Sequence, residues 1–563
     1  MKSIKDINLA PKPGKQYWKN CHREWREEFI YFLLVDRFHD NAQRSPMAFA
    51  ERHSGFGTKE QLVKSCGGTL RGITQHLDYI QNLGCTALWL SPVFENNTDA
   101  YHGYAIQNYL EVDKRWGTKE DLEALVDAAH ERDMRVFLDI VLHHSGDNWF
   151  YPDEHDYFYF QGERFPFGGW RSKNRPLPVE LRNPELYNRQ GQIRDYDTYP
   201  ETRDGDFNNL KAFRNDGSPE AEYVHDLLVD LHCYWIREAD IDGFRLDAAK
   251  HMSEISISRF CSAVREYAYT LGKKNFFLFG ELIGPDEVST NYFGPKTSVS
   301  INDKNVYYGL NSVLDFPLHE VLSEVIKGAA SPERLIERYT ALQHNALDRG
   351  ENGEFLVTFV DNHDQVGQNP KHRIGSDATP EQIVAAMGFL LCAIGTPCIY
   401  YGTEQGLDGS GDGDWAVREC LFDLRGKKTN LLNPNSRIYQ SIAAIAQIRK
   451  SSPVLKFGRM FIREISGGGQ HFHLPECHEC TLAFSRILFK EEILVVFNSS
   501  MDRTKEECVL IDFELNEKKT AMDCLYGGLE AVPILGHDEP ERNIRYVKLT
   551  LNPMQFVILK TAS

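Results

Sequence analysis

The feature that most constrains the fold of this 563-residue chain is a repeated alternation of short apolar runs and amphipathic segments. The runs EEFIYFLLVDRF, CTALWLSP and RVFLDIVL are nearly continuous in apolar residues, as expected for parallel strands buried on both faces. Between the second and third runs, Thr118 and Asp121 predict a capping box at the start of a helix. The predicted apolar face of that helix is formed by Leu122, Leu125, Val126 and Ala129. Such alternation predicts an α/β domain built on a parallel sheet.

The alternation is interrupted after His144 and ends before the C-terminus. Residues 145–210 are rich in Gly, Pro, Asp, Asn and aromatic residues and show little periodicity, which favours an inserted domain. Strand-like runs then return, in DIDGFRLDA, NFFLFGE, GLNSVLDF, LVTFVDN and TPCIYYG. Beyond residue 450, EEILVVFN and RYVKLTLNPMQFVIL are strand-like without a long helix between them, which favours a β-domain.

The predicted fold class is therefore α/β: a (β/α)8 TIM barrel with an inserted domain after strand 3 and a C-terminal antiparallel β-sandwich domain. The predicted ranges are 1–144 for the first part of the barrel, 145–210 for the insertion, 211–450 for the second part of the barrel and 451–563 for the β-domain.

Charge and cysteine usage narrow the expected partners and compartment. The formal net charge of −18 and the pI of about 5.6 disfavour nucleic acid and anionic membranes as partners. The first 20 residues lack the apolar core of a secretory signal, and no apolar run approaches the ~18 residues of a membrane span. The twelve cysteines are scattered, several of them within apolar runs, as expected for buried free thiols. A cytoplasmic protein is expected, and the sequence gives no oligomeric state.

Polar residues end the apolar runs, and in a TIM barrel the strand ends form the active site. A single carboxylate after a strand commonly caps the next helix. Here, however, the ends of four predicted strands carry such residues, so they are expected to meet at one barrel mouth. Three carboxylates around one point favour either a metal cage or glycoside chemistry. The residues are Asp139, His144, Arg245, Asp247, Glu281, His363 and Asp364.

Two of these carboxyl groups have contrasting sequence environments. Arg245 lies two residues before Asp247, so both point to the same face of the strand. The guanidinium is expected to keep Asp247 ionised, as a nucleophile requires. Glu281 follows the apolar run NFFLFG, where poor solvation is expected to raise its pKa, as a general acid requires. This pair predicts retaining glycoside cleavage.

Several motifs resemble those of one known family. DIVLHH, DGFRLDAAKH, FGE and FVDNHD resemble, in order, the four signature regions of the α-amylase family, glycoside hydrolase family 13. The segments DAYHGYAIQNY, GTPCIYYGTEQGL and DWAVREC resemble further regions of that family. The resemblance covers about residues 28–450 and implies the same barrel.

The resemblance also implies roles. Asp247 would be the nucleophile, Glu281 the acid and base, and Asp364 a group that binds sugar hydroxyls and stabilises the transition state. Tyr104 would stack on the sugar before the scissile bond. The implied substrate-binding residues are His102, Tyr104, His144, Arg245, Lys250, His251, His363, Asp414 and Arg418, with Lys250 and His251 on the leaving-group side. Asp139 would brace the site.

The residue after the nucleophile indicates the linkage. Family members that cut α-1,6 bonds tend to carry Val there, whereas those that cut α-1,4 bonds tend to carry Ala or Thr. Ala248 therefore favours α-1,4 glucans such as starch or maltodextrins. Hydrolysis is the favoured reaction. The alternatives are a 4-α-glucanotransferase, a cyclomaltodextrinase-type enzyme, a sucrose- or trehalose-type glucosyl transferase, and a glucosyl-phosphorylase or isomerase. A non-catalytic binding homologue is disfavoured, because the three carboxylates are retained.

The insertion carries many aromatic residues, which leaves two interpretations open. They would form either a sugar-binding wall or a small core for the insertion itself. They are Trp149, Phe150, Tyr151, Tyr157, Phe158, Tyr159, Phe160, Phe165, Phe167 and Trp170.

Two segments raise the question of a metal. HFHLPECHEC offers a short CxxC, Cys477 and Cys480, but lacks the second paired motif of a zinc site. Many α-amylases hold calcium through an Asn before the strand-3 histidine, an Asp in the insertion and a backbone carbonyl. Asp206 and His251 resemble the last two positions, but His143 occupies the Asn position. Imidazole offers only nitrogen to a cation that prefers oxygen, so neither cofactor nor metal is expected.

Overall fold

The computed structural model describes residues 1–19, 23–47, 54–154, 157–289, 292–293, 298–301, 304–307, 309–349, 356–364, 372–426, 428–476, 479–538 and 543–562. Its centre is an eight-stranded parallel sheet in the order β15-β12-β11-β6-β3-β1-β17-β16. A bridge between Leu314 and Val357 joins the two end strands and closes the barrel. In chain order the strands are β1 (Ile30–Leu33), β3 (Ala87–Leu90), β6 (Arg135–Val141), β11 (Gly243–Asp247), β12 (Phe277–Gly280), β15 (Ser312–Val313), β16 (Val357–Thr358) and β17 (Thr396–Tyr400).

Helices surround this barrel, which explains the continuous apolar strands: every residue of β6 is buried. The predicted capping box is present at α5 (Lys119–Glu131), where Thr118 Oγ1 accepts from the Asp121 amide. The other main helices are α7 (Pro219–Ala239), α8 (Glu254–Thr270), α10 (Phe316–Ile326), α11 (Glu333–Arg349), α12 (Pro380–Cys392) and α13 (Arg437–Ser451). Within the described part of the chain, no helix is both long and apolar enough to cross a bilayer.

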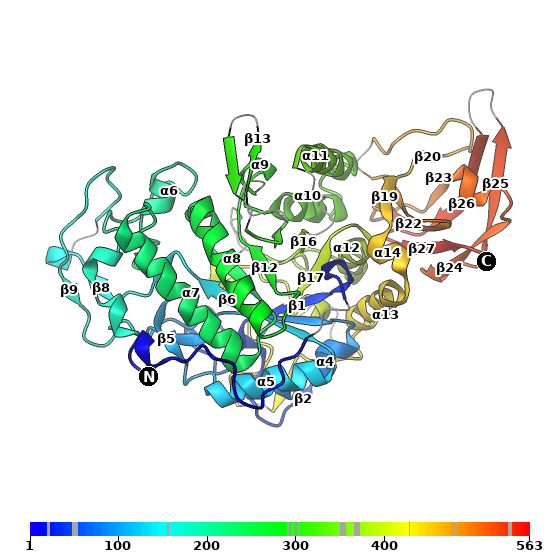
Figure 1. Cartoon of the computed structure of the whole chain (residues 1–563). Coiled ribbons are helices and arrows are strands. Elements are labelled where there is room, and N and C mark those ends of the chain that lie inside the picture. Colours follow the sequence, from blue (N-terminus) through cyan, green and yellow to red (C-terminus); the bar gives the residue numbers. More distant parts are fainter. Residues whose placement is uncertain are drawn as a thin grey trace.

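The chain leaves the barrel between β6 and α7 and forms the predicted insertion (Figure 1). Its regular elements are short and irregularly spaced, which explains the missing periodicity of its sequence. They are β7 (His144–Ser145), β8 (Trp149–Phe150), β9 (Gly169–Trp170), α6 (Glu201–Asp204) and β10 (Lys211–Ala212). The pairing of β7 with β10 ties the start of the insertion to its end, beside the carboxyl end of β6.

The C-terminal strands form an antiparallel β-sandwich on the opposite side of the barrel from the insertion (Figure 1). One layer holds β19 (Arg459–Ile462), β21 (Thr481–Leu488), β22 (Glu491–Asn498), β27 (Phe556–Thr561) and β24 (Ala521–Tyr526). The other holds β25 (Val532–Asp538), β26 (Asn543–Leu551), β23 (Lys505–Ile511) and β20 (Ile465–Ser466). A separate apolar core between the layers includes Leu494, Val509 and Val547. The predicted fold class is therefore confirmed.

Candidate active site

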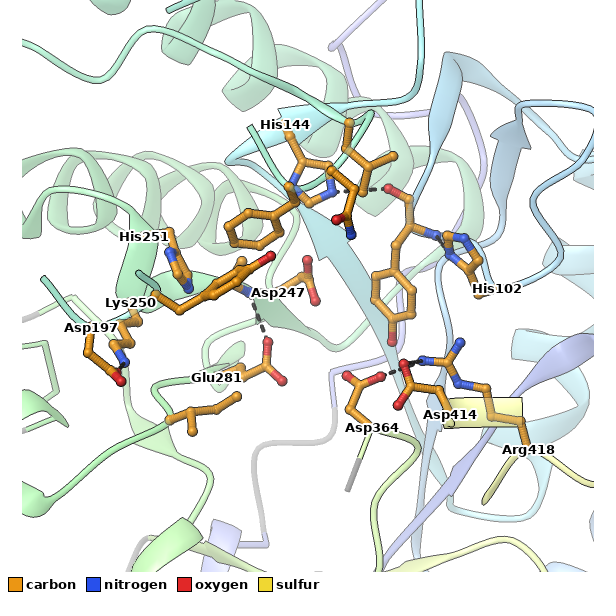
Figure 2. A pocket seen from close by; sticks show the side chains of 17 residues that line it. His102, His144, Asp197, Asp247, Lys250, His251, Glu281, Asp364, Asp414 and Arg418 are labelled. Atoms are coloured by element: carbon orange, nitrogen blue, oxygen red, sulfur yellow. Dashed lines mark hydrogen bonds and ion pairs between the residues drawn. The ribbon is translucent and has the colours of Figure 1, made fainter. Parts of the chain in front are cut away.

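The strand ends meet at a cavity of about 570 Å³, within the size range of small-molecule sites. Figure 2 shows Asp247 and Glu281, here called the floor of the cavity, between Asp364, Asp414 and Arg418 on one side and Lys250 and His251 on the other. Ten of the predicted site residues line it: His102, Tyr104, His144, Asp247, Lys250, His251, Glu281, Asp364, Asp414 and Arg418. Arg245 and His363 are fully buried and are not among the described lining residues.

Arg245 lies beneath the floor and joins three carboxyl groups. Its Nη1 donates to Asp247 Oδ1 at 2.7 Å and to Asp139 Oδ1 at 2.9 Å. Its Nη2 lies 2.8 Å from Glu281 Oε1. Two neighbouring nitrogens of one guanidinium therefore hold Asp247 and Glu281 side by side, while Oδ2 of Asp247 makes neither of these contacts. Asp139 is fully buried and serves as a brace.

The electrostatics of the two carboxyls differ from the sequence expectation. Burial raises the pKa of Glu281 to about 7, as expected, with Arg245 opposing the shift and Asp247 adding to it. Burial also raises the pKa of Asp247 to about 7, because the loss of hydration outweighs the attraction of Arg245. The expectation that Arg245 alone would keep Asp247 ionised is therefore wrong. One guanidinium is shared among several buried carboxyls, so near neutral pH the pair competes for protons.

The pKa of Asp364 is shifted in the opposite direction from those of Asp247 and Glu281. Burial opposes its ionisation, but His363, Arg418 and Arg245 hold its pKa well below the usual range. Arg418 Nη2 binds Asp364 Oδ1, and His363 Nε2 lies 3.1 Å from Asp364 Oδ2. Asp364 is therefore a fixed negative charge, suited to stabilising a cationic transition state. His363 is fully buried, so it contacts the Asp364 carboxylate and is not among the described residues that line the cavity.

Tyr104 lines the cavity and contacts a buried carboxylate and three histidines. Its hydroxyl donates to Asp139 Oδ2 at 3.0 Å, and its ring stacks on His363 with centroids 5.3 Å apart. Its backbone orients the two other histidines: the amide donates to His102 Nδ1 at 3.1 Å, and the carbonyl accepts from His144 Nε2 at 3.2 Å. A sugar hydroxyl that approached His144 would compete with this carbonyl.

The side of the cavity that carries Lys250 and His251 includes residues that the sequence did not predict. Tyr196 and Phe207 from the insertion line it beside His251, and Tyr196 is 43% exposed. Asp197 forms an ion pair with Lys250 at the rim (Figure 2). The insertion has no sequence periodicity from which the orientation of a side chain could be predicted. These residues can therefore be identified only from the fold.

Ala248 follows Asp247 and contacts Glu281. Its backbone has a left-handed conformation with φ 50°, and its amide donates to Glu281 Oε2 at 3.1 Å. A β-branched residue is strongly disfavoured in this conformation. The backbone conformation therefore favours a small residue at position 248, in addition to the space available for its side chain.

The aromatic residues predicted for the insertion mostly form its core. Trp149, Tyr151 and Tyr159 are buried, and Trp149 and Tyr151 pack edge to face with centroids 4.7 Å apart. None of the ten lines the described cavity, whereas Phe158 and Phe160 are 50% and 62% exposed. The small-core interpretation therefore holds for most of them.

The positions that resemble calcium ligands do not fit the cation. His143 Nε2 donates to the Arg203 carbonyl at 3.2 Å, and burial keeps its pKa well below the usual value. Asp206 accepts from the Tyr151 hydroxyl at 2.8 Å and from the Ala212 amide at 2.9 Å. Each carboxylate oxygen of Asp206 already accepts from a protein donor, and the imidazole of His143 offers no oxygen to a hard cation.

The zinc question falls partly outside the described residues, since Cys477 and His478 are not among them. Of the residues the structure does describe, no three His, Cys, Asp or Glu side chains are grouped as metal ligands.

Comparison with known proteins agrees with this geometry. A family model described as "Alpha amylase, catalytic domain" matches residues 32–419, a segment that includes every predicted site residue from His102 to Arg418. An α-amylase from Streptomyces lividans is 28% identical over 507 residues, covering 77% of this chain and 51% of that protein, so the chain spans about half of this relative's length. A cyclomaltodextrinase from Bacillus sp is 30% identical over 479 residues, covering 84% of this chain and 73% of that protein. The crystal structure of an α-amylase from Geobacillus thermoleovorans complexed with acarbose matches with a TM-score of 0.69 at 25% identity, covering 96% of this chain and all of the other.

Proposed function

Because the chain belongs to the α-amylase family, we propose that it is a retaining α-glycoside hydrolase. Its substrates would be starch- or maltodextrin-like glucans with α-1,4 bonds. The observation that carries this proposal is the shared guanidinium of Arg245, which holds Asp247 and Glu281 next to each other at the cavity floor. Retaining enzymes need such closely spaced carboxyls, ~5–5.5 Å apart, whereas inverting enzymes leave room for a water molecule between them.

The first step forms a covalent glycosyl-enzyme. Because Arg245 holds Oδ1 of Asp247, Oδ2 is the oxygen available to attack the anomeric carbon. Glu281, whose raised pKa keeps a proton near neutral pH, protonates the departing glycosidic oxygen. Asp364 remains ionised and stabilises the positive charge that develops on the sugar ring.

The second step releases the sugar. Glu281 has lost its proton and now accepts one from an incoming water molecule, which attacks the same anomeric carbon. The bond to Asp247 breaks, and the product keeps the α configuration. The aromatic ring of Tyr104 excludes water from one side of the sugar while its hydroxyl remains bound to Asp139.

An α-glucan is the favoured substrate for two reasons. The Geobacillus relative was solved with acarbose, and that likeness supports a chain of α-linked glucose units in the same cavity. Ala248 lines the cavity in a conformation that disfavours the Val typical of enzymes that cut α-1,6 bonds.

Transfer to a sugar acceptor is the second candidate function, as in a 4-α-glucanotransferase or a cyclomaltodextrinase-type enzyme. Tyr196 favours it, because an exposed aromatic face on the leaving-group side gives an incoming sugar a surface to stack on. Both reactions share the glycosyl-enzyme, so they differ only in the molecule that attacks it.

The cellular setting belongs to the same proposal. A carbohydrate is the expected partner, without nucleic acid, membrane or bound calcium, in the cytoplasm. The net charge of −18 and the free state of the described cysteines support this setting.

Product analysis tests the proposal. The protein is incubated with maltoheptaose, and early products are followed by ¹H NMR and chromatography, with Asp247→Asn as the inactive control. Hydrolysis predicts shorter products that first appear as α-anomers, and transfer predicts products longer than the substrate. First products in the β configuration would refute the retaining mechanism. Parallel reactions with isomaltose, a cyclodextrin and sucrose test the linkage, and a preference for isomaltose would overturn the α-1,4 assignment.

A further inference from the structure

Two cysteines lie together behind the wall of the cavity. Cys66 follows α2 (Lys59–Leu62), and Cys420 lies two residues after Arg418. The Nη1 atom of Arg37 lies 2.6 Å from Cys66 Sγ and 3.7 Å from Cys420 Sγ, and Cys66 packs against the small apolar cluster that contains Cys420. Both are free thiols, although they are more than 350 residues apart in sequence.

The two thiols differ in reactivity. Cys66 is partly exposed, whereas Cys420 is fully buried. The hydrogen bond from Cys420 lowers the pKa of the Cys66 thiol, and the charge of Arg37 adds to this effect against the opposing effect of burial. Burial raises the pKa of the Cys420 thiol well above its usual value. An accessible thiol with a lowered pKa beside a protected thiol is the arrangement that thiol–disulfide exchange requires.

The backbone keeps the two sulfur atoms close. The carboxylate of Asp36 accepts from the Cys66 amide at 2.8 Å, from the Gly67 amide at 3.2 Å and from the Ser65 hydroxyl. Cys420 exchanges two backbone hydrogen bonds with Phe56, at 2.9 and 3.1 Å. Neither residue is therefore on a loose chain segment, and both sulfurs are held beside the same guanidinium nitrogen.

A short chain of contacts connects the thiols to the active site. The Arg37 guanidinium stacks on the Tyr101 ring at 4.1 Å from its centroid. The Tyr101 hydroxyl accepts from Arg418 Nη1 at 3.3 Å, and Arg418 Nη2 binds Asp364. Because Arg37 is fully buried, its charge depends on the few groups around it, which include the Cys66 sulfur.

We propose that Cys66 and Cys420 form a thiol–disulfide exchange site that reacts with a low-molecular-weight disulfide such as oxidised glutathione. The Cys66 thiolate attacks one sulfur of the glutathione disulfide, forms a mixed disulfide and releases one glutathione thiolate. Cys420 then loses its proton and attacks the Cys66 sulfur, which releases the second glutathione thiolate. Two protein thiols are oxidised to one disulfide, and one glutathione disulfide is reduced to two thiols.

The oxidation alters the active site through Arg37. In the disulfide the sulfurs lie ~2.05 Å apart and carry no negative charge. Arg37 loses its contact with the Cys66 sulfur and keeps Asp36 as its carboxylate partner, so the stack of Arg37, Tyr101 and Arg418 adjusts. A displacement of a substrate-positioning group by ~1 Å is enough to reduce turnover by up to about 100-fold. The oxidised enzyme is therefore less active, and reduction restores it.

The test exposes the full-length protein to glutathione buffers from fully reduced to fully oxidised, followed by alkylation and peptide mass mapping. A peptide that links Cys66 to Cys420 is expected, together with a fall of about tenfold or more in kcat/KM on maltoheptaose that dithiothreitol reverses. The activity measurement rests on the proposed function. The peptide mapping does not depend on it, so a failure of the disulfide proposal can be distinguished from a failure of the proposed function.

Three variants complete the design. Cys66→Ser prevents both the link and the loss of activity, with Cys66→Ala as the replacement if the serine variant misfolds. Cys420→Ser stops the reaction at a glutathione adduct on Cys66. Cys524→Ser, which removes a partly exposed cysteine of the β-sandwich, leaves the response unchanged. The proposal is wrong if no Cys66–Cys420 link forms at any buffer ratio, or if the link forms without a change in kcat/KM.

Discussion

Replacing the buried carboxyl of Glu281 with an amide is expected to abolish activity and, at alkaline pH, to stabilise the protein. Glu281 is buried and has a pKa of about 7 in the folded protein against an ordinary value of 4.5. The folded state therefore binds this proton more tightly than the unfolded state. The resulting stability is complete below pH 4.5 and is lost as the pH rises to about 7. Glutamine has the shape of the protonated glutamic acid side chain and does not ionise. The Glu281→Gln variant therefore keeps this stability at alkaline pH.

The size of the effect follows from the pKa difference. At about 1.4 kcal/mol per pKa unit, ionised Glu281 lowers the free energy of unfolding by about 3 kcal/mol above pH 7. The entropy of unfolding is about 2 cal/mol/K per residue, so a chain of 563 residues converts this free energy into about 2–3 °C of Tm. Removing Glu281 also removes the repulsion between Glu281 and Asp247, which acts in the same direction.

Differential scanning fluorimetry at pH 5 and pH 8.5 measures this effect. The Tm advantage of Glu281→Gln over the wild type is expected to be about 2–3 °C larger at pH 8.5 than at pH 5. Glu320→Gln, at an exposed position of α10, is the matched control and should show no such pH dependence. An equal difference at both pH values would refute the conclusion that burial raises the pKa of Glu281.

Three further predictions follow from the site. Asp247→Asn should reduce kcat by about 10⁴-fold or more without lowering Tm, since the pKa of this buried carboxyl is raised like that of Glu281, and normal turnover by this variant would contradict its role as nucleophile. Arg418→Lys should reduce kcat/KM by about 10- to 100-fold, because a single ammonium cannot hold Asp364, the Tyr101 hydroxyl and the His363 carbonyl together; steady-state kinetics on maltoheptaose measure this loss, and an unchanged value would contradict it. Tm and activity should be the same with EDTA and with added calcium, because His143 and the partners of Asp206 occupy the ligand positions. A calcium-dependent rise in Tm of several degrees would overturn this last prediction.

The barrel and the catalytic positions could be predicted from sequence because both depend on local patterns. Strands buried on two faces are recognisable as apolar runs, and the polar residue that ends each run must lie at the carboxyl end of the barrel. That argument identified Asp247, Glu281 and Asp364 without knowledge of their separation. It also identified Arg245, whose position two residues before Asp247 fixes the face on which it lies.

Two properties of the site depend on the fold and could not be predicted. Tyr196 and Asp197 reach the cavity from the irregular insertion, where no periodicity indicates which side chains face the barrel. Burial raises the pKa of Asp247, and the guanidinium that opposes this shift is shared with Glu281 and Asp139, which come from two other parts of the barrel. The spacing in the sequence predicted that Arg245 contacts Asp247. It could not predict that Glu281 and Asp139 compete with Asp247 for the same guanidinium.

The central claim is that Asp247 forms a covalent bond to the sugar, and trapping that bond tests it most directly. In the Glu281→Gln variant, α-maltotriosyl fluoride can still glycosylate the enzyme, because fluoride leaves without a general acid, whereas hydrolysis lacks its general base. Intact-mass spectrometry should show one added maltotriosyl group, and peptide mapping should assign it to Asp247. An adduct on another residue, or none while the fluoride is consumed, would contradict the account.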